Sequence, residues 1–209
     1  MARLLGLSKV PVFAEEGDAK ITGEFGEIIK DYPVEGQTGR HTALDLVRCT
    51  DGKTSETATI TAMADGIIIA QRKWVKGFSS AKATAGNCVY IKHRNGMVSK
   101  YFHLEYGSMP EWICDGAEVK KNDVLGYMGA TGYAFGVHLH FQVEDENGVC
   151  VDPEPYLLGI KSFDPEPPSP PAIYRLALKR EFSSYDEAVK ALNGLNDIGI
   201  STELLIRQK

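Results

Sequence analysis

The chain has 209 residues, of which 43% are hydrophobic and 24% are charged, and its formal net charge is -5. This length suits one medium domain with a small appendage, and the composition is ordinary for a globular protein. The acidic balance argues against non-specific nucleic-acid binding and against an anionic membrane surface, and no apolar run approaches the roughly 20 residues of a membrane span.

The N-terminus only loosely resembles a secretory signal. Lys9 interrupts the apolar residues that follow Arg3, and Glu15 and Glu16 come soon afterwards. A signal peptide needs an unbroken apolar stretch of roughly 7–15 residues, so we infer that none is present. We therefore expect synthesis in the cytoplasm, and any action outside the cell would need a separate route of release.

Short apolar segments bounded by turn signals predict β-strands in the first 160 or so residues. Ala64-Asp65-Gly66 separates the first two segments, and Arg94-Asn95-Gly96 separates the next two. An Asn-Gly pair is a strong hairpin signal, because both turn positions favour positive φ. Without any long helical period, this pattern predicts a mainly β domain with an antiparallel sheet. The segments are residues 58–62, 66–70, 88–92, 97–102 and 137–143.

A proline-rich segment, residues 164–171, predicts a stiff, extended linker. It separates a body, residues 1–163, from a small unit, residues 172–209. Ser184 and Glu187 fit a capping box, and the flanking apolar patterns predict a strand-helix-strand (α+β) module. A unit this short can hardly bury a core of its own, so we expect it to pack on the body or to pair with a second copy as a homodimer.

The four cysteines are widely scattered, which argues against a cysteine zinc site and directs attention to the histidines. In residues 137–143, strand alternation places His138, His140 and Gln142 on one face and apolar side chains on the other. Two imidazoles on one face can bind a metal together, or one can bind it while the other acts on a bound water. Two ordinary solvent-facing histidines would explain this segment equally well.

His41 and Asp45 form a second candidate pair, because mixed histidine and carboxylate ligands are typical of catalytic zinc. In one straight strand they would lie about 13 Å apart, too far to share a metal. The chain must therefore bend between them, or His41 must lie in an incoming loop, which Gly36 and Gly39 favour. Taken alone, a surface histidine and a turn aspartate explain this pair better.

Two further histidines follow predicted strands. Alternation in residues 98–104 predicts that His103 shares a face with Tyr101 and Ser99. On its own, His103 fits a strand-end histidine with a structural hydrogen bond. His93 lies at the shoulder of the predicted hairpin, and we expect a solvent-exposed turn residue.

In combination, these histidines and Asp45 resemble the lysostaphin-like (LytM-type) zinc endopeptidases. Members of that family carry His-x-x-x-Asp, then a lone histidine after a strand, then His-x-His on a later strand. The chain has His41-Thr42-Ala43-Leu44-Asp45, then Tyr101-Phe102-His103-Leu104, then His138-Leu139-His140. The resemblance covers residues 22–155. It extends to the intervening segments, residues 64–66, 86–91, 115–119 and 125–129.

The resemblance implies that His41, Asp45 and His140 bind Zn²⁺ and that His103 and His138 are catalytic. Three protein ligands leave a fourth position for water, whose pKa zinc lowers towards about 7. One imidazole could take a proton from this water, and the other could stabilise the oxyanion or protonate the leaving amine. The expected activity is hydrolysis of peptide bonds in peptidoglycan, with the bond itself left open.

Ala43 departs from the family, because many members have glycine midway in His-x-x-x-Asp. Alanine would be strained if this position needs positive φ, but it would serve if only a small side chain is needed. We expect the second case, because all five polar residues are present.

Aromatic residues in nearby loops are candidates for the walls of a substrate groove. They are Trp74 and Phe78 in residues 73–84, Trp112 in residues 106–115, and Tyr133 and Phe135 before the histidine pair.

Two other functions compete with this interpretation. A catalytically inactive scaffold or amidase activator of the same fold would typically have lost ligands, whereas this chain keeps them. A lipoyl-type carrier needs a lysine at a tight exposed turn, where residues 64–66 offer Ala-Asp-Gly instead. The apparent lack of a signal and the small C-terminal module favour a bacteriolytic phage or prophage endolysin released through a holin pore, although a tail-associated lysin fits too. The module could target the cell wall.

Overall fold

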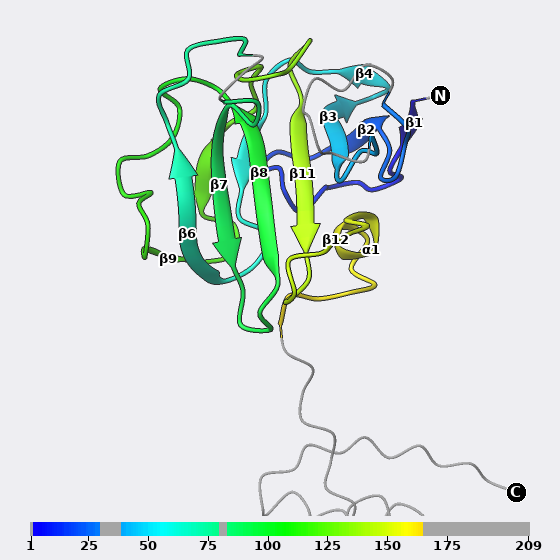
Figure 1. The fold of residues 1–209 in the computed structure, drawn as a ribbon. Helices are drawn as coiled ribbons and strands as arrows, with labels where there is room; N and C mark the ends of the chain where they lie inside the picture. The colour runs from blue at the N-terminus through cyan, green and yellow to red at the C-terminus, as the bar shows by residue number, and fades with distance from the viewer. Residues whose placement is uncertain (1, 30–38, 80–82, 165–209) are drawn as a thin grey trace, which may run out of the picture. The chain divides into compact units, whose positions relative to one another are not determined.

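The computed structural model describes residues 2–29, 39–79 and 83–164 (Figure 1). Internal contacts divide the chain after Pro165, and the described residues lie in the first unit. The predicted C-terminal module and almost all of the predicted linker lie outside the described residues, so the domain boundaries and the homodimer stay predictions. In the described ranges, no helix is long and apolar enough to cross a membrane.

One large antiparallel sheet dominates the described residues. Its strands run in the order β1-β2-β3-β11-β8-β7-β6-β9, with β4 beside β3 and β12 beside β11. A second sheet contains only β5 and β10. These strands are β1 Arg3–Leu4, β2 Asp18–Gly23, β3 Leu44–Thr50, β4 Lys53–Thr54, β5 Thr59–Thr61, β6 Gly66–Arg72, β7 Asn87–Lys92, β8 Val98–Leu104, β9 Glu118–Val119, β10 Val124–Tyr127, β11 Leu139–Glu144 and β12 Cys150–Val151. One short helix, α1 Glu154–Leu157, follows, and the prediction of a mainly β, antiparallel fold is confirmed.

The two faces of the large sheet differ in what covers them. On one face, alternate side chains such as Ile68, Ile91 and Phe141 are fully buried in a core that also contains Ile60 of β5 and Leu125 of β10. The other face borders a cleft, and Figure 1 shows its strands β6, β7, β8 and β11 side by side. Strand alternation therefore separates a packing face from a face that is available for chemistry.

The predicted turns differ in outcome. The hairpin around Asn95 and Gly96 is present as β7–β8, although only Gly96 has positive φ, and Asn95 Oδ1 instead accepts a hydrogen bond from the Met97 N–H (3.1 Å). Residues 58–62 and 66–70 do not pair with each other. They form β5 and β6, which belong to different sheets, so the turn between them carries the chain from one layer to the other.

His93 is buried, so the prediction of a solvent-exposed turn residue was wrong. Its side chain is only 3% exposed. The two ring nitrogens lie 2.8 Å from the Asp65 carbonyl oxygen and 2.8 Å from Ser99 Oγ, and the ring packs against Phe163 at a centroid distance of 4.2 Å. A segment far along the chain therefore covers this end of the hairpin, and no local pattern around His93 could reveal that.

Burial lowers the pKa of His93, which predicts a pH-dependent contribution to stability. The unfolded chain, with a histidine pKa of about 6.5, binds a proton that the folded chain excludes. The free energy of unfolding therefore falls as pH decreases from about 6.5 towards the folded pKa. In His93→Gln, the slope in this range should be shallower by up to about 1.4 kcal/mol per pH unit.

Urea denaturation at several pH values, with a chelator in both samples so that metal binding does not contribute, measures this slope. Identical slopes for the wild type and His93→Gln would contradict a lowered pKa of His93 in the folded protein.

Candidate metal centre

The first candidate pair meets because His41 lies outside the strand. Strand β3 begins at Leu44, so His41 belongs to the incoming loop, and its Nε2 lies 3.2 Å from Asp45 Oδ1. The loop alternative is therefore the observed one. Ala43 is fully buried and does not have positive φ, so alanine is not strained at this position, as expected.

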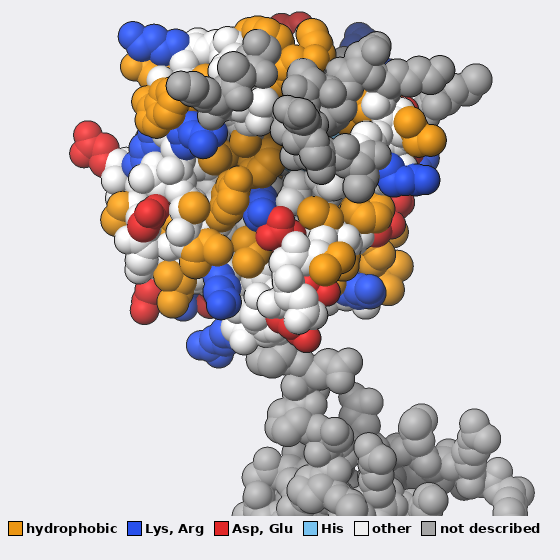
Figure 2. Space-filling model, viewed as in Figure 1, with side chains coloured by type: hydrophobic (Ala, Val, Ile, Leu, Met, Phe, Trp, Pro, Cys, Tyr) orange, Lys and Arg blue, Asp and Glu red, His pale blue; other side chains and the backbone are white. Residues whose placement is uncertain are grey.

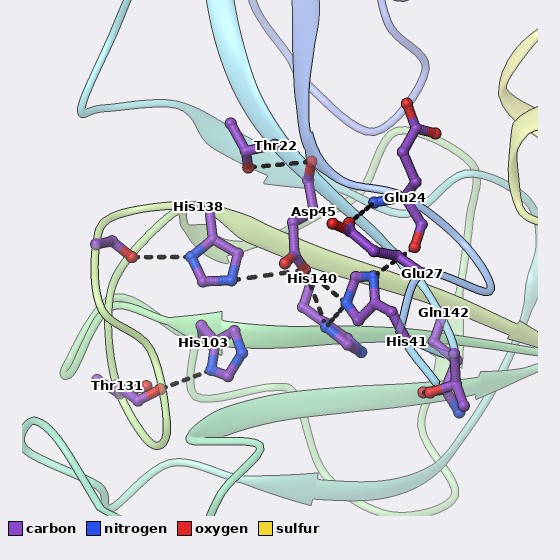
Figure 3. Close-up of polar contacts among 12 residues, drawn as sticks. Thr22, Glu24, Glu27, His41, Asp45, His103, Thr131, His138, His140 and Gln142 are labelled. Carbon is purple, nitrogen blue, oxygen red and sulfur yellow. Dashed lines mark hydrogen bonds and ion pairs between the residues drawn. The ribbon is translucent and has the colours of Figure 1, made fainter. Parts of the chain in front are cut away.

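His140 completes a triangle of candidate ligand atoms. Strand β11 pairs with β3 so that His140 lies directly opposite Asp45. His140 Nδ1 lies 3.0 Å from Asp45 Oδ1 and 3.2 Å from His41 Nε2 (Figure 3). A tetrahedral zinc ion with bonds of 2.0–2.2 Å needs ligand atoms about 3.3 Å apart. The three atoms therefore fit the ligand spacing of one zinc ion.

Neighbouring groups orient these ligands. The Glu24 carbonyl oxygen lies 3.1 Å from His41 Nδ1, so Nδ1 donates a hydrogen bond to it and Nε2 is the ring nitrogen that faces the other two candidate ligands. The ring of Phe102 stacks on the ring of His140, with an interplanar angle of 1° and a centroid distance of 5.0 Å. Both contacts restrict ring rotation, so the imidazoles are held in place before any metal binds.

Gly23 makes room for the Asp45 carboxylate and was missed by the sequence analysis. It pairs with Asp45 across β2 and β3. A Cβ atom on Gly23 would lie 2.5 Å from Asp45 Oδ2 and 3.1 Å from His41 Cε1. Its position at the end of β2 gave no signal of this role in the sequence, because the contact depends on strand pairing.

Burial and hydrogen bonds together shift the pKa values of the three candidate ligands. Burial alone would raise the pKa of Asp45, but hydrogen bonds from His140 and His41 outweigh it and hold that pKa well below its usual range. Burial would likewise lower the pKa of His41, yet the hydrogen bond to Asp45 raises it overall. Burial lowers the pKa of His140. The cluster therefore holds an ionised carboxylate that is suited to a cation.

His103 reaches the same place through an irregularity in β8. Val89 of β7 pairs with Tyr101, but Asn87 pairs with Leu104, so two residues of β8 lie opposite Cys88 alone. His103 lies in this β-bulge with φ of 64°, a conformation that costs a non-glycine residue about 1–3 kcal/mol. Tyr101 points into the core while Phe102 and His103 both line the cleft. The prediction that His103 shares a face with Tyr101 was therefore wrong.

Backbone groups fix the orientation of His103. Its N–H donates to the Ala85 carbonyl oxygen (3.0 Å), and its Nδ1 lies 2.8 Å from the Thr131 carbonyl oxygen, which leaves Nε2 as the acceptor. Burial lowers the pKa of His103 to about 3, so the imidazole is neutral.

A Cβ on Gly132, which has positive φ, would lie 2.2 Å from the main-chain nitrogen of Gly86. This close approach holds the loop that carries Thr131, another contribution that sequence motifs did not reveal.

His138 completes the group of five polar residues. Its Nδ1 lies 2.8 Å from the Gly136 carbonyl oxygen, and its Nε2 lies 3.6 Å from Asp45 Oδ1. The rings of His138 and His103 are 4.8 Å apart between centroids. Figure 3 shows these two rings next to Asp45 and His140. The structure therefore brings all five residues named by the sequence analysis to one place.

The five residues line a cleft of about 880 Å³ on the open face of the large sheet. Tyr133 and Phe135 line it, and Phe78 packs on both rings at centroid distances of 5.4 and 5.7 Å. Phe135 is 83% exposed. Of the aromatic residues expected in the walls, Trp74 and Trp112 are not among the described residues that line the cleft. Among the described residues, the loop before β11 therefore provides Tyr133 and Phe135 to the cleft wall, and Phe78 of a second loop supports them.

Comparison with known proteins agrees with this geometry. Residues 41–153 match the sequence profile of peptidase family M23. The chain belongs to this family. The lysostaphin-like, LytM-type resemblance inferred from the motifs is thereby confirmed.

Two curated relatives and one solved structure are similar to this chain. The chain is 30% identical to the DD-carboxypeptidase/endopeptidase Mpg of Neisseria meningitidis over 64% of its own length and 26% of the relative. It is 32% identical to the peptidoglycan DD-endopeptidase ShyC of Vibrio cholerae over 53% of its own length and 22% of the relative. The match thus spans about a quarter of these relatives. A crystal structure of a SpoIIIAH–SpoIIQ complex matches 76% of this chain and 100% of that chain, with a TM-score of 0.52 and 21% identity, which shows a shared fold.

The contact at Gly23 predicts an indirect effect on metal binding. In Gly23→Ala, the new methyl group must displace the Asp45 carboxylate or the His41 ring. We expect zinc affinity to fall by about 10- to 100-fold, as for other changes to groups that orient metal ligands. Competition with a fluorescent zinc chelator measures this affinity.

Gly77→Ala is the matched control, because Gly77 lacks positive φ and nothing lies within 4 Å of its added Cβ. Equal zinc affinity in Gly23→Ala and Gly77→Ala would contradict the proposed role of Gly23.

Proposed function

We propose that the protein is a zinc metalloendopeptidase that hydrolyses peptide bonds in peptidoglycan stem peptides or cross-bridges. The observation that carries this proposal is the triangle of ligand atoms from His41, Asp45 and His140, with edges of 3.0–3.2 Å. These atoms come from segments far apart in the chain, and they converge in a cleft beside two further imidazoles.

His41, Asp45 and His140 would hold the zinc ion, and a set of three protein ligands leaves one position open, as in catalytic zinc sites. When bound, zinc lowers the pKa of water and polarises a carbonyl group. The protein itself provides ligands that are already aligned by Glu24 and Phe102. It also provides the negative charge of Asp45, which stabilises a divalent cation.

His103 and His138 would transfer protons. Each has Nδ1 beside a backbone carbonyl oxygen, so each neutral ring can present Nε2 as a proton acceptor. One imidazole would accept the proton of the attacking water, and the other would donate to the leaving amine or stabilise the oxyanion. Their ring separation of 4.8 Å lets both reach groups on one scissile bond.

Peptidoglycan is the proposed substrate because the names of the two relatives describe DD-endopeptidases, one of them of peptidoglycan. The complete set of five polar residues favours an enzyme over an inactive scaffold or amidase activator. Action as a phage-type endolysin released through a holin, and wall targeting by residues 172–209, stay predictions.

Two variants test this function. The purified wild type should contain close to one zinc per chain and should release new amine termini from peptidoglycan. His140→Ala should lose zinc, because one ligand is gone. His138→Ala should retain zinc and lose about 10²- to 10⁴-fold in activity, the usual contribution of a general acid or base.

Elemental analysis of each variant, together with mass spectrometry of digested muropeptides, provides both readouts. Full cleavage by a zinc-free preparation, or full activity of His138→Ala, would contradict the mechanism.

A further inference from the structure

The floor of the cleft continues beyond the metal centre along β8 and β11. Phe102 pairs with His140, and the next cleft-facing pair along these strands is Lys100 with Gln142. Glu144 follows Gln142 on the same face of β11. One step of two residues along a strand is about 7 Å. The second pair therefore lies about two residues of an extended substrate away from His140.

Lys100 and Glu144 form an ion pair on this floor. Lys100 Nζ contacts Glu144 Oε1, and the two side chains are only 13% and 17% exposed. Lys100 Nζ also lies 4.6 Å from the centre of the Tyr90 ring. Figure 2 shows a basic and an acidic side chain side by side near the middle of this face, next to hydrophobic side chains. Opposite charges therefore occupy a mostly shielded part of the cleft.

The neighbours of Lys100 and Glu144 do not use all the hydrogen-bonding groups of this ion pair. Gln142 Nε2 donates to the same Glu144 Oε1 (2.9 Å), while Gln142 Oε1 accepts from Thr42 Oγ1 (3.0 Å). Among the described residues, no donor contacts Glu144 Oε2. Lys100 Nζ has three N–H donors, and Glu144 Oε1 is its hydrogen-bond acceptor in the described part of the chain. Within the described ranges, one carboxylate oxygen and at least one ammonium hydrogen thus have no protein partner and can bind a ligand.

A shielded ion pair contributes little net stability, because desolvation offsets its Coulomb attraction. A substrate that carries both charges would recover that cost, since its own ammonium and carboxylate would each gain a partner. A glycine residue could use neither group, and a lysine side chain could use Glu144 alone and would bring its ammonium close to Lys100.

We propose that Lys100 and Glu144 form a specificity subsite for a substrate residue whose side chain ends in an ammonium and a carboxylate on the same carbon, as in a peptidoglycan diamino acid. The ammonium binds Glu144 Oε2, and the carboxylate binds Lys100 Nζ. This subsite rests on the proposed function and defines its substrate class.

The test compares three synthetic stem peptides that differ only at the end of this side chain. The first has both charges, the second has the carboxylate converted to a carboxamide, and the third has lysine. The zinc-loaded wild type should have a kcat/KM at least roughly tenfold higher for the first peptide, the effect of one charged hydrogen-bond pair. Lys100→Met should abolish the difference between acid and amide.

Glu144→Gln is a second test variant, and its side chain has nearly the same shape as that of glutamate. It keeps an acceptor for Lys100 but replaces the second oxygen with an amide nitrogen, so all three peptides should lose at least roughly tenfold. Lys120→Met is the control, because its ion pair with Asp65 (3.1 Å) does not line the cleft. It should behave like the wild type.

Binding separates the subsite from the proposed hydrolysis. Calorimetry measures the affinity of two uncleavable tripeptides, one whose last residue has the zwitterionic side chain and one whose last residue is lysine. Equal affinities in the wild type, or an unchanged preference in folded Lys100→Met, would overturn the subsite. Selective binding without cleavage of any peptide would instead overturn the proposed function and leave the subsite supported.

Discussion

The antiparallel pairing of β3 with β11 is the constraint on which the site depends. It places Asp45 directly opposite His140, so two candidate ligands that are 95 residues apart in sequence lie on neighbouring, hydrogen-bonded strands. His41 joins them from the loop just before β3. Slipping the register by one residue would turn His140 into the core and Leu139 or Phe141 into the cleft. The hydrophobic core therefore also specifies the geometry of the metal centre.

Local irregularities adapt this sheet to chemistry. The bulge in β8 turns His103 onto the cleft face, where an even alternation would have placed it beside Tyr101. The contact between Gly86 and Gly132 holds the loop whose carbonyl oxygen at Thr131 orients the same ring. The strain at His103 is offset by two hydrogen bonds to backbone carbonyl oxygens. Its main-chain N–H bonds to Ala85, and its ring Nδ1 bonds to Thr131. Farther along the same face, Lys100 and Glu144 add charge where the cleft continues.

Much of the fold class and the identity of the five polar residues could be predicted, because both depend on local patterns. Alternation revealed the cleft face of β11, and the order of the motifs linked residues 41–45 to residues 138–140. The face of His103 could not be predicted, because a bulge depends on pairing with β7. The burial of His93 depends on Phe163, and the role of Gly23 depends on its neighbour across the sheet. These errors share one cause: each contact joins segments that are distant in sequence.

The central claim, that one zinc ion is held by His41, Asp45 and His140, is tested most directly by anomalous diffraction. Data would be collected just above and just below the zinc absorption edge from crystals grown with one equivalent of zinc. The account predicts a single strong anomalous peak about 2 Å from His41 Nε2, Asp45 Oδ1 and His140 Nδ1. A zinc peak elsewhere, with none between these three atoms, would contradict it.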